Sequence, residues 1–105
     1  MDKLYELVAQ AKAIVAGSNP DRRSLWRAYV ALEYAVIDIK LRHNLEGEVP
    51  PTKLARKAIN IEKARLMLAQ IELSSDMKKL LYDLRACRDV VKALVAGYDR
   101  RSITS

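Results

Sequence analysis

The chain has 105 residues, half of them hydrophobic, so its length and composition fit one domain with a single core. Its formal net charge of +6 makes a polyanion such as RNA or DNA a permissible partner without requiring one. No apolar run reaches the roughly 18 residues of a transmembrane helix, and the first residues lack the pattern of a targeting segment. The only cysteine, Cys87, excludes an internal disulfide and suits a reducing compartment, so we expect a cytoplasmic protein without a membrane partner.

Residues 2–16 repeat apolar side chains at three- and four-residue intervals, which predicts a first helix that stops at a left-handed Gly17. Asn19, Pro20 and Asp21 then form a helix-start signal in which Asn19 supplies the capping amide. Residues 20–43 carry two neighbouring apolar stripes, the first formed by Leu25, Tyr29, Leu32, Val36 and Ile39, the second by Trp26, Val30, Ile37 and Leu41. A helix apolar over so much of its circumference needs several neighbours, so we predict that it is the central helix.

Gly47, Pro50 and Pro51 predict a loop after this helix. A third helix is predicted for residues 52–72. Its inward residues would be Leu54, Ala58, Ile61, Ala64, Leu68 and Ile71, and its largely outward residues Arg56, Lys57, Lys63 and Arg65. Residues 74–76 could start a separate fourth helix or lie within one kinked helix. The fourth apolar pattern runs from Met77 to a stop near Gly97, and residues 98–105 are expected to form a flexible tail.

These segments predict an all-α fold, a four-helix up-and-down bundle, as one domain over residues 1–97. In that topology the second and fourth helices run parallel, and their C-terminal ends lie together. The basic residues expected at that end form a candidate nucleic-acid-binding site: Lys40, Arg42, Lys53, Arg56, Lys57, Lys92, Arg100 and Arg101.

The sequence contains none of the common catalytic patterns. One histidine and one cysteine, far apart, do not form a zinc site, and Glu33, Asp38 and Glu62 lack the Glu-x-x-His spacing of di-iron bundles. No glycine-rich loop is present to bind phosphate. We therefore expect no metal, no cofactor and no enzyme activity.

Residues 81–93, LYDLRACRDVVKA, resemble the signature helix of the HEPN superfamily of small helical domains. The motif of that family is arginine, then asparagine, aspartate or histidine, then three variable residues and a histidine. Arg88 and Asp89 match its first two positions, and Ala93 stands where the histidine should be. Residues 27–35, RAYVALEYA, are similar to a helix opening that is common in small prokaryotic members. The resemblance covers about residues 20–97.

In active members of this superfamily the arginine and the histidine, paired across a dimer, cleave RNA. The histidine performs the acid–base step and the arginine stabilises the developing charge, and alanine can do neither. The resemblance therefore implies a non-catalytic homodimer that binds nucleic acid, a nucleotide or a protein such as a nucleotidyltransferase. Two alternatives stay open, namely a basic RNA- or DNA-binding bundle unrelated to HEPN, and a metal-independent ribonuclease that uses His43 with Arg88.

The candidate residues also have structural interpretations. Arg88 and Asp89 could form a solvated helix edge, and His43 could complement the dipole at a helix C-terminus. The aromatic residues could border the core, stack on bases or line a subunit interface. Three arginines near the start of the central helix could bind phosphate or only be solvated: Arg22, Arg23 and Arg27.

Overall fold

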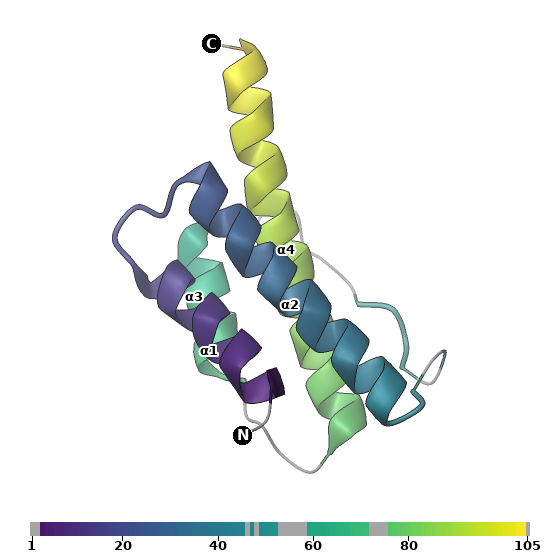
Figure 1. Cartoon of the computed structure of the whole chain (residues 1–105). Helices are drawn as coiled ribbons and strands as arrows, with labels where there is room; N and C mark the ends of the chain where they lie inside the picture. The colour runs from purple at the N-terminus through teal and green to yellow at the C-terminus, as the bar shows by residue number, and fades with distance from the viewer. Residues whose placement is uncertain (1–2, 46, 48, 53–58, 72–75, 105) are drawn as a thin grey trace.

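The computed structural model describes residues 3–45, 47, 49–52, 59–71 and 76–104, with side chains described up to residue 97. Its helices are α1 (Lys3–Ala16), α2 (Arg22–Arg42), α3 (Ile61–Ala69) and α4 (Met77–Thr104) (Figure 1). The predicted all-α, four-helix fold is confirmed. Within the described part of the chain, no helix is both long and apolar enough to cross a membrane.

The order of the helices around the bundle differs from the predicted one. α1 and α4 each pack against both α2 and α3. Figure 1 shows that α2 and α4 run in opposite directions, so the predicted parallel arrangement of these two helices is wrong. Residues 43–60 explain the difference, because an extended segment of that length can span roughly 60 Å, about twice the roughly 32 Å length of α2. α3 begins at the end of the bundle opposite to the C-terminus of α2 (Figure 1).

The core lies between α2 and α4, with further side chains from α1 and α3. The inner face of α2 is 0–3% exposed and consists of Leu25, Ala28, Ala31, Leu32, Ala35, Val36 and Ile39. The facing positions of α4 are equally buried and consist of Leu80, Leu81, Leu84, Cys87, Val90 and Val91. The three alanines leave room for the neighbouring helices to approach α2 closely. Both helices therefore bury one continuous face. On α2 this face contains the first apolar stripe, with Tyr29 only partly buried, whereas the second stripe stays exposed, so the prediction that several neighbours cover both stripes is wrong.

Both ends of α2 are fixed by local hydrogen bonds. Asp21 is the N-cap, and its carboxylate accepts a 2.8 Å bond from the backbone N–H of Ser24. The predicted cap, Asn19, is wrong because Asn19 has a φ of 51°, whereas a capping residue needs an extended backbone. At the other end, Asn44 has a φ of 52° and the N–H of Leu45 donates to the carbonyl of Lys40. This arrangement is a Schellman motif, and the buried side chain of Leu45 secures it.

The link between α1 and α2 is held by a residue of α3. Gly17 does not adopt the predicted left-handed conformation, since the N–H of Gly17 closes a short turn onto the carbonyl of Ile14. Arg65 of α3 donates to the carbonyl of Val15 at 2.8 Å and to that of Gly17 at 2.7 Å. The sequence pattern placed Arg65 outward, but its side chain is half-buried and joins α3 to the end of α1 and to the link that follows it.

The boundaries of α3 and α4 also differ from the predicted ones. Thr52 is not helical, and α3 begins only after Asn60, whose side chain caps it by accepting a 2.8 Å bond from the N–H of Lys63. The predicted inward positions Leu54 and Ala58 lie outside the described residues. α4 is a separate helix that begins at Met77 and continues through Gly97 to Thr104, so the predicted end near Gly97 is wrong. A glycine costs a helix only about 1 kcal/mol, and no proline follows it here.

Candidate functional site

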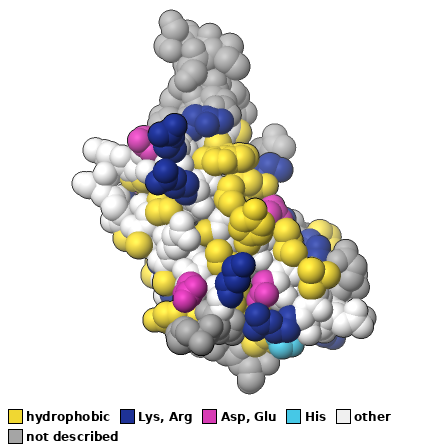
Figure 2. Space-filling model, viewed as in Figure 1, with side chains coloured by type: hydrophobic (Ala, Val, Ile, Leu, Met, Phe, Trp, Pro, Cys, Tyr) yellow, Lys and Arg dark blue, Asp and Glu magenta, His cyan; other side chains and the backbone are white. Residues whose placement is uncertain are grey.

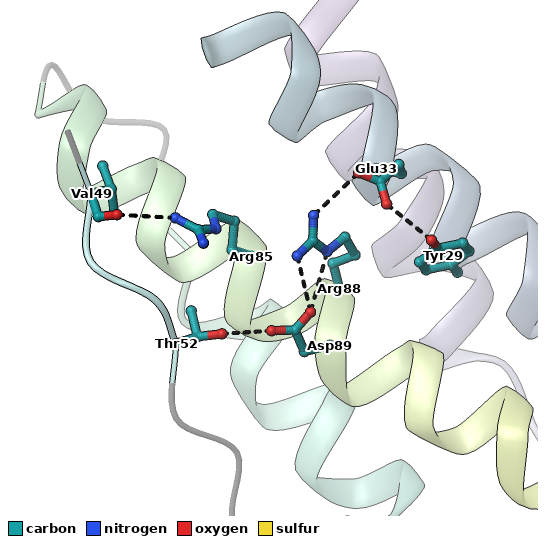
Figure 3. Close-up of polar contacts among 7 residues, drawn as sticks. All are labelled: Tyr29, Glu33, Val49, Thr52, Arg85, Arg88 and Asp89. Atoms are coloured by element: carbon teal, nitrogen blue, oxygen red, sulfur yellow. Dashed lines mark hydrogen bonds and ion pairs between the residues drawn. The ribbon is translucent and has the colours of Figure 1, made fainter. Parts of the chain in front are cut away.

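The two residues that match the HEPN motif lie in a polar cluster between α2 and α4 (Figure 3). Nη1 of Arg88 contacts Oε1 of Glu33 on α2 at 3.2 Å. Nη2 and Nε of the same guanidinium contact Oδ1 of Asp89 at 3.1 and 3.3 Å. The Arg88 side chain is only 21% exposed. It lies between two carboxylates and joins the two longest helices, α2 and α4.

The second carboxylate also fixes the segment that follows α2. Thr52 donates its hydroxyl to Oδ2 of Asp89 at 2.5 Å, and Arg85, one turn earlier on α4, donates to the carbonyl of Val49 at 3.3 Å (Figure 3). Asp89 therefore bonds on one side to Arg88 and on the other to the connection. These contacts hold part of the long connection against α4.

Tyr29 completes the cluster on α2. Its hydroxyl donates to Oε2 of Glu33 at 2.9 Å, so both oxygens of that carboxylate are bonded. The bond to Glu33, followed by burial, raises the pKa of Tyr29 above its ordinary value, because the carboxylate stabilises the neutral phenol. Tyr29 and Glu33 are one helical turn apart, which places both side chains on the same side of α2.

The composition of this cluster limits its chemistry. The guanidinium of Arg88 is engaged by two carboxylates, so a phosphate would have to displace Glu33 or Asp89 from Arg88. Ala93 lies one turn beyond Asp89, half-buried, with no group that could transfer a proton. Among the described residues, no group of three His, Cys, Asp or Glu side chains is placed to hold a metal ion. The cluster as it stands is built to join helices.

His43 does not lie beside Arg88 within one chain. It is the exposed C-cap of α2, ten residues beyond Glu33, which corresponds to about 15 Å along the helix axis. Its backbone N–H donates to the carbonyl of Ile39 at 3.0 Å. A ribonuclease that pairs His43 with Arg88 would need a different arrangement from the one seen in this chain.

The predicted basic end is divided between two places. Lys40 and Arg42 lie in the last turn of α2, where Arg42 pairs with Asp38 at 3.1 Å. Lys92 lies in the C-terminal half of α4. Because α2 and α4 are antiparallel, this half runs toward the end of the bundle where α2 begins, away from Lys40 and Arg42 (Figure 1). Arg100 and Arg101 are in the last turns of α4, with side chains outside the described set, and Lys53, Arg56 and Lys57 lie outside the described residues altogether. The expected gathering of Lys92, Arg100 and Arg101 beside Lys40 and Arg42 is therefore wrong.

The sequence pattern did not identify Tyr29, Glu33 or Thr52 as members of this cluster. Glu33 and Tyr29 are four residues apart on a helix, a spacing that could have suggested a shared polar site. Thr52 offered no such signal, because the sequence pattern placed it at the start of a helix. Its contact with Asp89 depends on the path of the connection.

A second candidate region is the outer face of α2, which we define as Trp26, Val30, Tyr34, Ile37 and Leu41. Four of its side chains are large and exposed, with exposed fractions of 47% for Trp26, 57% for Tyr34, 41% for Ile37 and 77% for Leu41. Figure 2 shows hydrophobic side chains in a band along α2. The second apolar stripe of the sequence is thus left uncovered by the bundle.

No family model, curated protein or solved structure matches this chain. Its function has to be inferred from the residues themselves and from their geometry.

Proposed function

We propose that the protein is a non-catalytic, HEPN-like interaction module that forms a homodimer through the part of the outer face of α2 that runs from Val30 to Leu41. The observation that carries the proposal is the exposure of Tyr34, Ile37 and Leu41 on one side of one helix, with Trp26 beyond them toward the helix start. Elsewhere in the described chain only Tyr5 and Leu66 are comparable, and each lies on a different helix. A row of large apolar side chains is typical of a protein-binding surface.

The spacing along this face suits a helical partner. Val30, Tyr34, Ile37 and Leu41 follow one another at intervals of four, three and four residues. This is the spacing of the two apolar positions of a heptad, which pack against the same seam on another helix. A second copy of the chain offers an identical seam, and a two-fold axis would bury both together.

The charges on α2 favour an antiparallel pair. Arg23 and Arg27 continue the same seam toward the helix start, so a parallel pair would place each arginine opposite its copy. In an antiparallel pair centred between Tyr34 and Ile37, Val30 faces Leu41 of the second copy. The two arginine-rich segments then lie at opposite ends of the interface, where they do not repel each other.

The polar cluster supports a binding role in place of catalysis. Arg88 is engaged by Glu33 and Asp89, and Ala93 occupies the position at which the HEPN motif has its base. A protein partner of nucleotidyltransferase type is the further expectation that the HEPN-like motif brings. The buried thiol of Cys87 is consistent with a cytoplasmic role for this module.

Size-exclusion chromatography with light scattering at micromolar concentration tests the dimer. We expect a species of twice the 11.9 kDa chain mass for the wild type and a monomer for Leu41→Glu, because a carboxylate in the seam would be buried without a partner. A wild type that is monomeric throughout the micromolar range would overturn the proposal.

The matched control is Leu66→Glu. Leu66 is also exposed, at 56%, but it lies on α3, away from the outer face of α2. This variant should remain dimeric. If Leu66→Glu dissociates the dimer and Leu41→Glu does not, the interface lies on α3.

A further inference from the structure

The first two turns of α2 carry a surface of different character from the apolar seam. Arg22, Arg23, Trp26 and Arg27, which we name the arginine–tryptophan surface, are all exposed. In Figure 2, Lys and Arg side chains lie at the end of the molecule where α2 begins, next to the hydrophobic band. The outer side of one helix therefore changes from basic and aromatic to apolar along its length.

Helix stability does not account for these arginines. The positive end of the helix dipole lies at the N-terminus, where cations are unfavourable, and α2 has no acidic residue in its first turn. The nearby carboxylate of Asp21 already accepts the N–H of Ser24. That bond, and to a smaller extent the charges of Arg23 and Arg27, lower the pKa of Asp21. The surface therefore keeps an excess of positive charge at a place where the helix itself does not benefit from it.

Trp26 gives this surface a flat aromatic group. It is 47% exposed, and its ring lies against that of Tyr29, with centroids 5.2 Å apart and planes inclined by 41°. Tyr29 is in turn fixed by its bond to Glu33. One part of the indole is thus supported by the protein while another is open to solvent. An exposed aromatic ring among arginines can stack on a nucleobase while the cations contact phosphates.

We propose that the arginine–tryptophan surface binds single-stranded nucleic acid, with Trp26 stacking on a base and Arg23 and Arg27 contacting neighbouring phosphates. The combination favours this ligand over a free phosphate or an acidic peptide, neither of which has a base to stack on Trp26. Lys92 adds a cation toward the same end of the molecule, because it lies one turn beyond Arg88 on the antiparallel α4. The site differs from the basic end that the sequence suggested.

This inference goes beyond the proposed dimer and does not depend on it. In the antiparallel pair described above, the seam runs from Val30 to Leu41 and leaves both copies of the arginine–tryptophan surface outside the interface. A dimer would therefore carry two such sites, one at each end of the paired helices. A monomeric variant should retain one.

The test uses a 12-nucleotide oligouridine and the intact chain in about 50 mM salt. Trp26 is the only tryptophan, so quenching of its fluorescence reports contact directly, and the anisotropy of a labelled oligonucleotide gives the affinity. We expect quenching, and a loss of affinity of roughly 5- to 100-fold in Trp26→Ala, the range for one stacked base. Arg23→Glu/Arg27→Glu should weaken binding at least about tenfold and flatten its dependence on salt.

The control for net charge is Lys3→Glu/Lys63→Glu, which changes the total charge equally at two exposed positions on α1 and α3. It should weaken binding less than about threefold. Leu41→Glu should bind as the wild type does, which separates this site from the dimer seam. The proposal is overturned if no binding occurs at low salt, if Trp26 fluorescence does not change on binding, or if the lysine control loses as much affinity. Circular dichroism checks folding, and Arg23→Gln/Arg27→Gln replaces any charge-reversal variant that unfolds.

Discussion

The two faces of α2 are both apolar, but the inner face is buried in the bundle and the outer face is exposed to solvent. On the inner face Leu25, Leu32 and Ile39 are at most 1% exposed, whereas on the outer face Tyr34 and Leu41 are more than half exposed. Both faces repeat at helical spacing, and they lie on the same 21 residues. Hydrophobic periodicity therefore identifies surfaces that need a partner, but it does not say whether that partner belongs to the same chain.

The arrangement of the bundle explains the difference. α2 packs on α1 and α4, while α3 packs on those two helices from the other side. Two neighbours cover the inner side of α2 and leave its outer side open. α3, with only nine residues, is not placed to cover it.

The largest contrast should come from leucines on the two faces. Leu32→Ala removes a fully buried side chain and should lower the free energy of unfolding by about 2–5 kcal/mol, whereas Leu41→Ala should lower it by less than about 0.5 kcal/mol. Urea denaturation followed by circular dichroism measures both, at a concentration low enough for the wild type to be monomeric. Equal losses would mean that Leu41 is packed in the core of the monomer.

The next contrast concerns ion pairs at the edge of the inner face and on the surface. Arg88→Met leaves Glu33 and Asp89 partly buried without their cation, which should lower the free energy of unfolding by about 1–3 kcal/mol. Lys79→Met, which removes an exposed pair with Asp83, should cost no more than about 0.5 kcal/mol. Adding Glu33→Gln to Arg88→Met should recover part of the loss. An Arg88→Met variant as stable as the wild type would show that the guanidinium is not needed to join α2 and α4.

Cys87, on the face of α4 that packs in the core, gives a contrast that depends on pH. Burial, and then the nearby charge of Asp83, raises the pKa of this thiol from 9.0 to about 12. As pH rises, the thiol therefore loses its proton in the unfolded chain before it does so in the folded chain. The contribution of the protonated thiol to the stability of the folded state is complete below pH 9 and decreases as pH rises toward 12. The free energy of unfolding of the wild type relative to Cys87→Ala should fall by about 1 kcal/mol between pH 8 and pH 10. A difference that does not change with pH would contradict this prediction, and alkylation at pH 8 should be much faster in urea than in the folded protein.

The smallest effect is expected at the start of the outer face. The lowered pKa of Asp21 means that its carboxylate stabilises the folded state above its ordinary pKa of 3.8, and that this contribution is lost as pH falls through the lowered value. Asparagine caps a helix equally well without titrating. Asp21→Asn should therefore match the wild type near pH 7 in thermal unfolding and lose less stability below pH 4. Parallel pH profiles for the two proteins would refute this.

Several features of the fold were predictable because they depend on residues close together in the sequence. The bounds of α1 and α2 follow from apolar spacing and from the residues between the two helices. The extent of α3 and the continuation of α4 were not predictable in this way. α3 starts after Asn60 and not at Thr52, although both residues can cap a helix. Gly97 destabilises α4 too little to end it.

The candidate site was predicted only in part for the same reason. Arg88 and Asp89 stood out by their resemblance to a motif, Trp26 by its place in the second apolar stripe, and the arginines of α2 by their position near the helix start. Glu33 and Thr52 acquire their roles only through contacts with α4 that span many residues of sequence. Lys92 lies away from Lys40 and Arg42, because α4 runs antiparallel to α2 and not parallel to it as predicted (Figure 1).

The sequence by itself determined that the protein is helical, that α2 carries two apolar stripes, and that the histidine position of the motif is alanine. These properties are local, because side-chain spacing and helix capping act over one or two turns. The tertiary structure decided which stripe of α2 is buried and which carboxylates hold Arg88. It also decided that the C-terminal ends of α2 and α4 lie at opposite ends of the bundle (Figure 1). Those outcomes are not local, because a long connection between α2 and α3 permits either direction for the helices that follow, and only the packing of the whole core selects one.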